Sequence, residues 1–223
     1  MKTFISVILI VSAGILIFML AKGGTTITTS QNGSVKGTSA IGKGHDLGSR
    51  VDPTDSVEGN PNATVVLIEY SDFQCPECKL YYPLVRDLSN KYKDNVAIVY
   101  RHYPLVDKHK NAVAAAKAAE AAGKQGKFWE MSYILFDHQD EWKDLGDSSK
   151  AFGDYAQSLG LNLDTFKTDL NDPRIDEKIE NNVTSGDAIG LSGTPTFVLN
   201  GKIVNGRTVD DFSKEIDSVL KQQ

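Results

Sequence analysis

The sequence has only two cysteines in 223 residues, and both lie in one short segment, at Cys75 and Cys78. With no third cysteine, neither thiol has a structural disulfide partner elsewhere in the chain. The pair is most simply a reversible dithiol and disulfide. There is also no second Cys-x-x-Cys segment, and His102, His109 and His138 are scattered without an i, i+4 pair. The ligand set of a tetrahedral zinc site is therefore missing, and we expect no metal.

The sequence also lacks an excess of basic residues. Lysine and arginine number 24 against 29 aspartates and glutamates, which gives a formal net charge of −5. This balance offers no electrostatic footprint for nucleic acid. With 40% hydrophobic residues, the length suits one globular domain that is large enough to bury a full core.

Charge is absent from one long segment at the N-terminus. Residues 4–21 contain no charged side chain and lie between Lys2 and Lys22. This length is at the lower edge of what spans a bilayer and exceeds the usual apolar region of a cleaved signal. The segment ends without a clean small-x-small cleavage pattern, so residues 1–22 are interpreted as a signal anchor, with a cleaved signal peptide as the alternative. Both interpretations place the rest of the chain outside the cytoplasmic membrane (in the periplasm or at the cell surface), where disulfides persist.

Residues 23–50 are rich in glycine, serine and threonine and show no apolar period. This composition predicts a flexible linker. The folded domain is expected over residues 51–223.

The start of that domain predicts a strand–helix–strand unit. An apolar run over residues 64–70 predicts a strand, the Cys-Pro-Glu-Cys segment follows, and a helical pattern continues from Lys79 with a proline inside it at Pro83. A second strand is predicted over residues 96–103. Since a helix joins them, the two strands should be parallel.

The rest of the domain predicts a helical insertion followed by a hairpin. Residues from about 108 to 190 are helical in pattern throughout. Asn200-Gly201 then separates two short apolar runs, at 196–199 and 202–204, which is a strong signal for a type I′ hairpin. A final helix is expected to begin near Thr208.

The order of strand, loop, Cys-x-x-Cys and helix puts Cys75 at a helix N-terminus. The helix dipole and the free backbone N–H groups there favour a thiolate over a thiol. The site is therefore suited to nucleophilic sulfur chemistry.

In these features the chain resembles the DsbA-like thiol:disulfide oxidoreductases of the thioredoxin superfamily, from about Val51 to the C-terminus. The motifs that carry the resemblance are, in chain order, residues 67–78, 101–105, 126–129 and 193–197, followed by Asn200-Gly201. The resemblance implies an α/β thioredoxin fold, a central mixed β-sheet flanked by helices, with an inserted helical subdomain.

The resemblance also implies a role for each cysteine. Cys75 is expected to be the exposed nucleophile and Cys78 the more buried resolving thiol. A substrate thiolate attacks Cys75 of the oxidised form to give a mixed disulfide, and a second substrate thiol releases the reduced enzyme. In the reductive direction Cys75 attacks and Cys78 resolves.

The segment Thr194–Pro195 is implied to be a cis peptide that faces the cysteines and contacts the substrate. Without the resemblance, Pro195 would be interpreted as a proline at the start of a strand. We expect Thr194 and Pro195 to bind substrate.

Glu69 is a carboxylate in an otherwise apolar strand. It is either an outward-facing strand residue or, as the resemblance implies, a buried acid beneath the disulfide. A buried carboxyl could relay the proton when Cys78 attacks or leaves, which would make Glu69 catalytic.

The residues between the cysteines, Pro76 and Glu77, are expected to tune the redox potential. Strongly oxidising members of the family have a histidine where this chain has Glu77. An acidic side chain beside Cys75 should raise the pKa of that thiol, which predicts a weaker oxidant than the histidine-bearing relatives. If Glu77 points into solvent, its charge is screened and the effect is small.

These features predict a protein disulfide oxidoreductase that introduces disulfides into exported, cysteine-containing proteins. Its only redox group would be the Cys75–Cys78 disulfide itself, with no further cofactor. A quinone-linked membrane protein would regenerate the disulfide, and residues 4–21 would hold the enzyme at the membrane. The alternatives are a reductase or isomerase on the same fold and, in a different class, a metallochaperone that clamps a soft metal with the dithiol.

Overall fold

The computed structural model describes residues 50–222. The predicted anchor or signal and nearly all of the predicted linker lie outside these residues. Within residues 50–222, no helix is both long enough and apolar enough to cross a membrane.

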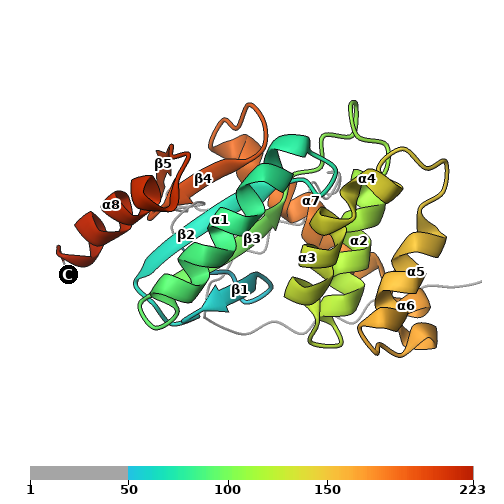
Figure 1. Cartoon of the computed structure of the whole chain (residues 1–223). Helices are drawn as coiled ribbons and strands as arrows, with labels where there is room; N and C mark the ends of the chain where they lie inside the picture. The colour runs from blue at the N-terminus through green and yellow to red at the C-terminus, as the bar shows by residue number, and fades with distance from the viewer. Residues whose placement is uncertain (1–49, 223) are drawn as a thin grey trace, which may run out of the picture. The chain divides into compact units, whose positions relative to one another are not determined.

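The domain is built on a five-stranded mixed sheet with the strand order β1-β3-β2-β4-β5 (Figure 1). Two strands run parallel at its centre, β2 (Val65–Ser71) and β3 (Val96–His102). The other three strands are antiparallel to their neighbours: β1 (Ser56–Gly59), β4 (Thr196–Leu199) and β5 (Lys202–Val204). The strand–helix–strand prediction is confirmed.

The two central strands are buried along their whole length. Strands covered on both faces are typical of the parallel part of an α/β sheet. One face of the sheet packs against helices α1 (Pro76–Tyr92) and α8 (Val209–Leu220). Helix α1 continues through Pro83, the proline that the sequence places inside it.

The edge strand β1 was not predicted from the sequence. It has four residues, of which only Val57 is a large apolar residue, so it shows no alternating pattern. It pairs with β3 and ends at Gly59, which has a φ of +80°. A Cβ at Gly59 would lie 2.4 Å from the carbonyl oxygen of Val96, so this turn requires glycine.

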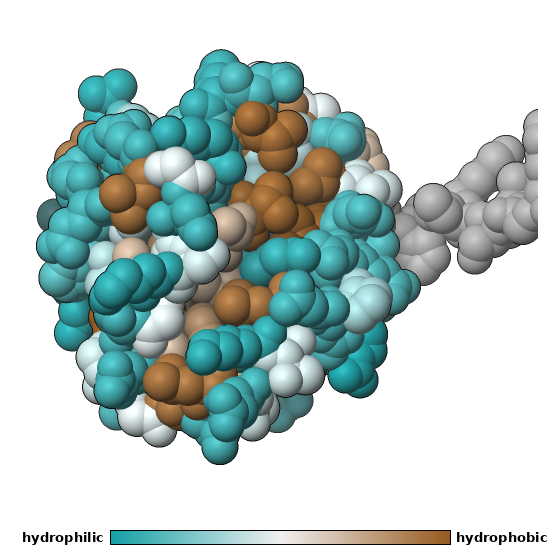
Figure 2. Space-filling view, turned by 90° about the vertical axis from the view of Figure 1, so that its right-hand side faces the viewer, coloured by the Kyte–Doolittle hydropathy of each residue, from teal (hydrophilic) through white to brown (hydrophobic). Residues whose placement is uncertain are grey.

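Six helices lie between β3 and β4, which confirms the predicted helical insertion. They are α2 (Ala112–Gly123), α3 (Phe128–Asp137), α4 (Gln139–Trp142), α5 (Ser149–Ser158), α6 (Leu163–Asp169) and α7 (Pro173–Ala188). Their core contains the buried rings of Trp142 and Phe152 and also includes Cys75 and Cys78. The insertion therefore packs against the cysteine end of α1. On the side of the domain where these helices lie, brown hydrophobic patches alternate with hydrophilic side chains (Figure 2).

The predicted hairpin joins β4 and β5. Asn200 and Gly201 have φ values of 43° and 84°, the left-handed conformations that a type I′ turn needs. The Asn200 side chain also accepts a hydrogen bond from the backbone N–H of Val66 at 2.7 Å. It thereby ties the turn to the neighbouring strand β2.

Helix α8 begins with a capping box. The Thr208 hydroxyl accepts a hydrogen bond from the backbone N–H of Asp211, and the Asp211 carboxylate accepts one from the N–H of Thr208. We predict that Thr208→Ala lowers the free energy of unfolding by about 1 kcal/mol, because it leaves an N-terminal N–H of the helix without a partner. Denaturant unfolding measures this loss.

Ser218→Ala is the matched control, since Ser218 is exposed in the last turn of the same helix. It removes a hydroxyl without removing a cap. Equal destabilisation by the two variants would contradict the role of the box.

Candidate active site

The loop after β2 places Cys75 at the N-cap of α1 and Cys78 one turn inside the helix. Cys75 has an extended backbone (φ −70°, ψ 123°), and Pro76 occupies the first helical position, which suits proline. Both cysteines are free thiols. Cys78 is fully buried, and Cys75 is 6% exposed. Cys75 is therefore the more accessible thiol, although it is less exposed than the sequence analysis expected.

The two thiols have opposite pKa shifts. A hydrogen bond from the Cys78 thiol is the largest influence that lowers the pKa of Cys75, whereas burial raises this pKa. The Thr194 side chain and the backbone N–H groups of Cys78 and Glu77 lower it as well, and the resulting pKa is about 6. Burial, together with the same hydrogen bond, raises the pKa of Cys78 well above its ordinary value. At neutral pH Cys75 is a thiolate and Cys78 a thiol, which separates a nucleophile from a resolving group.

For Glu77 the structure favours the second of the two alternatives, an exposed side chain with a small effect. The sequence argument has Glu77 raise the pKa of Cys75, whereas the net shift is downward. The Glu77 side chain is exposed, where solvent screens its charge, and its backbone N–H helps to stabilise the thiolate. Pro76 is also exposed. A weaker oxidising power than that of histidine-bearing relatives stays a prediction.

The segment before β4 closes over the Cys75 sulfur. The Thr194–Pro195 peptide bond is cis, as the resemblance implied. The Cys75 Sγ lies 3.5 Å from the carbonyl oxygen of Thr194, to which it donates a hydrogen bond when the thiol is protonated. Both Thr194 and Pro195 are half-buried. The structure therefore brings these two residues together with the cysteines.

Glu69 is buried rather than outward-facing. Its residue is 3% exposed, and it lies opposite Tyr100 of β3 and Phe197 of β4. Burial raises the pKa of Glu69 to about 7; the nearby Ser71 side chain opposes the rise and the Cys75 charge adds to it. The charge of Glu69 in turn raises the pKa of Cys78. The carboxyl is thus electrostatically coupled to both thiols.

The loop before Cys75 is held by polar side chains that the sequence analysis did not identify. The fully buried Asp72 carboxylate accepts hydrogen bonds from the N–H of Gln74, the N–H of Leu105 and Nδ1 of His109. Gln139 of α4 donates to the carbonyl oxygens of Phe73 and Cys75 at 2.7 and 3.0 Å. Apart from the local contact between Asp72 and Gln74, these contacts span 33 to 66 positions of sequence, so no short-range pattern predicts them.

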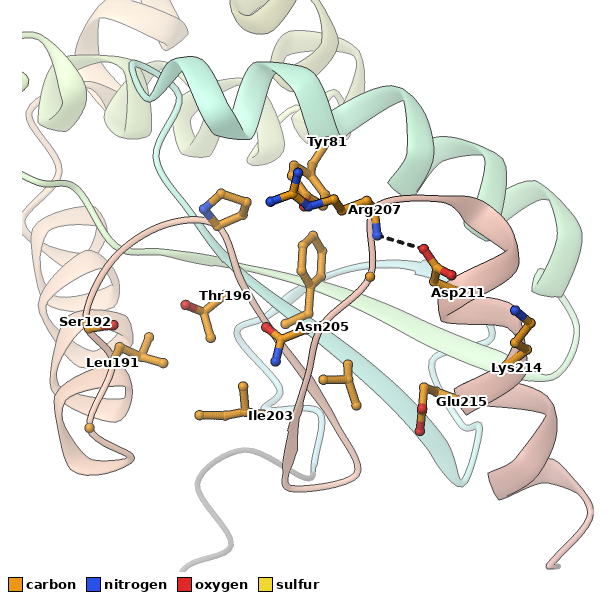
Figure 3. Close-up of a pocket in the computed structure, with 15 residues that line it drawn as sticks. Tyr81, Leu191, Ser192, Thr196, Ile203, Asn205, Arg207, Asp211, Lys214 and Glu215 are labelled. Carbon is orange, nitrogen blue, oxygen red and sulfur yellow. Dashed lines mark hydrogen bonds between the residues drawn. The ribbon is translucent and has the colours of Figure 1, made fainter.

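A groove of about 660 Å³ runs beside the cis-proline (Figure 3). Tyr81 of α1 and Arg207 approach each other on one side of it, and Leu191 and Ser192 lie on another. The groove also has a charged wall from the start of α8, formed by Asp211, Lys214 and Glu215. Pro195 lines the groove, and its neighbour Thr194 contacts the Cys75 sulfur.

Over residues 50–222, no group of three or more histidine, cysteine, aspartate or glutamate side chains is placed to hold a metal ion. The arrangement at Cys75 and Cys78 is that of a thiolate beside a buried thiol. Its direct chemistry is therefore thiol–disulfide exchange.

We predict that Cys78→Ala raises the pKa of Cys75 above its value of about 6, because the variant removes the hydrogen bond that lowers it most. Cys78→Ser is the matched control, since its hydroxyl can still donate to the sulfur. The pH dependence of Cys75 alkylation by iodoacetamide measures both pKa values. An unchanged pKa in the alanine variant would contradict this assignment.

The stability of the reduced protein should depend on pH. The pKa of Cys75 is about 6 in the folded state against an ordinary value of 9.0, so the stabilisation is complete above pH 9 and is lost as the pH falls to 6. We predict that the melting temperature of the reduced form rises relative to that of the oxidised form between pH 6 and 9. A constant difference between the two melting curves over this range would show that the thiolate contributes nothing.

The thioredoxin family model matches residues 51–218. Among solved structures, a thioredoxin-like oxidoreductase from Silicibacter pomeroyi DSS-3 is 26% identical and superimposes with a TM-score of 0.65, covering 76% of this chain and 94% of that one. The thiol-disulfide exchange protein α-DsbA2 from Wolbachia pipientis is 22% identical with a TM-score of 0.66, covering 75% of this chain and 88% of its own. It shares the fold.

Other relatives are named as antiporters rather than as oxidoreductases. The Na⁺/H⁺ antiporter NhaA 1 of Salinispora arenicola is 44% identical over 162 residues, which are 72% of this chain but 24% of that protein. The chain thus spans about a quarter of the length of the curated relatives it matches, and their antiport activity is not carried over to it. Taken with the fold and the paired thiols, the family match establishes that the chain belongs to the thioredoxin family and has the DsbA-like architecture of thiol–disulfide exchange proteins.

Proposed function

We propose that this protein is a thiol:disulfide oxidoreductase that introduces disulfides into exported proteins outside the cytoplasmic membrane. The observation that carries the proposal is the pairing of a Cys75 thiolate at a helix N-terminus with a buried Cys78 thiol. The Cys75–Cys78 disulfide would be the only redox group. The location rests on the N-terminal segment and on the likeness to proteins of DsbA-like fold.

The oxidising direction follows from the stability of the reduced form. A thiolate that is stabilised in the folded protein makes the dithiol state more stable, so the disulfide state is the better oxidant. The Cys75 pKa of about 6 lies between the values of about 7 for thioredoxin and about 3.5 for DsbA. On this argument the protein is an oxidant of intermediate strength.

The substrates would be partly unfolded proteins with free cysteines. An extended segment would bind along the groove at Thr194–Pro195 with its sulfur at Cys75. Apolar side chains are exposed at Leu80, Val106 and Leu145, on segments that flank the cysteine loop. Exposed apolar side chains of this kind suit contact with unfolded chains. A quinone-linked membrane protein would then reoxidise Cys78 and Cys75.

We predict that Cys78→Ala traps mixed disulfides with exported cysteine-containing proteins when it is produced with its N-terminal segment. Cys75 can still form the first bond, whereas the resolving thiol is missing. Non-reducing gels and mass spectrometry would identify the adducts and the linked cysteine.

The double variant Cys75→Ala/Cys78→Ala is the control, and it should trap nothing. If the single variant forms no adduct that a reductant releases, the proposed function is wrong. Refolding of a reduced, disulfide-containing test protein by the oxidised wild type then gives the direction: net disulfide formation is expected, and net reduction would favour the reductase alternative.

A further inference from the structure

A row of buried polar atoms without a hydrogen-bond partner lies behind the two cysteines. The atoms are Glu69 Oε1, Ser71 Oγ, Tyr100 OH and Glu58 Oε2. Buried polar groups nearly always have partners, so four such atoms together are unusual. They come from the three neighbouring strands β1, β3 and β2, where Glu58 lies opposite Ile98 and Glu69 lies opposite Tyr100. Since Ile98 and Tyr100 are two residues apart, the two carboxyl groups share one face of the sheet.

A small cavity joins these groups. It has a volume of about 10 Å³, and its lining includes Glu58, Glu69, Tyr100 and Tyr133. This is about the room that one buried water molecule needs, and such a water needs two to four polar partners. The unpartnered oxygens of the two glutamates and of Tyr100 supply them.

The inner end of the row reaches the resolving thiol. Tyr100, which lines the cavity, packs in the same core cluster as Cys75 and Cys78. The Ser71 side chain lowers the pKa values of Glu69, Cys78 and Tyr100. It nevertheless makes no hydrogen bond of standard geometry.

The outer end reaches the surface. The Tyr133 hydroxyl of α3 donates to Glu58 Oε1 at 2.6 Å. The guanidinium of Arg86, an exposed residue of α1, lies 5.0 Å from the centre of the Tyr133 ring and also lines the cavity. Burial raises the pKa values of Tyr100 and Tyr133, so both keep their protons at neutral pH.

We propose that one water molecule in this cavity passes a proton between Glu69 and Glu58. Glu58 would then exchange that proton with solvent whenever Cys78 gains or loses a proton during disulfide exchange. The inference rests on the proposed exchange activity and adds to it the route by which the proton reaches solvent. Glu58 touches neither the thiols nor the substrate. It is a positioning residue that acts through Glu69.

The proton balance is simple in both directions. When a substrate thiolate bonds to the Cys75 sulfur, the Cys75–Cys78 bond breaks and Cys78 leaves as a thiolate. Glu69 gives Cys78 a proton and regains one through the water from Glu58, which takes its own from solvent. In reverse, the Cys78 thiol loses its proton to Glu69 as its sulfur attacks the mixed disulfide and the substrate thiolate leaves, and Glu69 passes this proton through the water and Glu58 to solvent.

The carboxyl of Glu69 is surrounded by few groups that titrate or carry charge. The neighbouring residue of β4 is the apolar Phe197. The groups that line the cavity or act on Glu69 are Glu58 of β1, Tyr100 of β3, Cys75 before α1, Cys78, Tyr82 and Arg86 of α1, and Tyr133 of α3. No lysine or histidine is among the residues that line the cavity. Glu58 is therefore the carboxylate that can exchange a proton with Glu69.

The test separates the two chemical steps. Oxidised glutathione is mixed with the reduced protein, and acid quenching with mass spectrometry follows formation of the Cys75 mixed disulfide and its resolution by Cys78. We expect Glu58→Gln to slow resolution by about tenfold, less than the roughly 100-fold contribution of a group that touches the reacting proton. Formation of the mixed disulfide should keep its rate, and Glu58→Asp should restore most of the resolution rate.

The decisive measurement is a double-mutant cycle. If Glu58 acts through Glu69, then Glu58→Gln has no further effect on resolution in a Glu69→Gln background. Glu180→Gln, an exposed change of equal charge on α7, should leave both steps unchanged. Equal slowing in both backgrounds, no slowing, or slowing of both steps would overturn the proposal.

Tyr133→Phe provides a second test if Glu58→Gln does not fold. It removes the hydroxyl that holds Glu58, so resolution should slow, and the effect should again vanish beside Glu69→Gln. A rate equal to that of the wild type would overturn the route. If wild-type Cys78 fails to resolve the mixed disulfide at all, the proposed function fails, which is a separate result.

Discussion

The hydrogen bond between the Cys78 thiol and the Cys75 sulfur is the interaction on which the rest of the site depends. It is the largest influence that lowers the pKa of Cys75, and it raises that of Cys78. It requires one sulfur at the helix N-terminus and the other one turn inside, in a place that water does not reach. The opposite shifts make one cysteine a nucleophile and the other a protonated resolving group. The disulfide that closes between them is then a good electron acceptor because its reduced form is stable.

The fold holds this arrangement from three directions. Strand β2 ends just before the cysteine loop, and the Asp72 carboxylate fixes the backbone of that loop. The helical insertion reaches the same loop through Gln139, whose amide bonds the carbonyl oxygens on either side of Gln74. From the C-terminal half, Thr194 brings its carbonyl oxygen to the Cys75 sulfur. Segments that are distant in sequence therefore meet at one sulfur, which explains why the insertion shares its core with the cysteines.

Much of this architecture follows from local sequence signals. The apolar runs, the Asn200-Gly201 turn and the cysteine spacing are short-range patterns, and each predicted its element correctly. The edge strand β1 was not predicted, because four residues with one large apolar side chain show no alternating pattern. The sequence left two alternatives for Glu77 because adjacency says nothing about direction: the side chain is exposed, while its N–H helps to stabilise the Cys75 thiolate. Asp72, Gln139 and Tyr100 were missed because only tertiary packing brings them to the site.

The equilibrium reduction potential of the Cys75–Cys78 pair against glutathione tests the central claim most directly. A thiolate with a pKa of about 6 stabilises the reduced form more than in thioredoxin and less than in the strongest oxidants. We therefore predict a potential between the values of about −270 mV for thioredoxin and about −120 mV for DsbA. A potential at or below about −270 mV would contradict it, because the reduced form would then gain nothing from the Cys75 thiolate and the protein would act as a reductant.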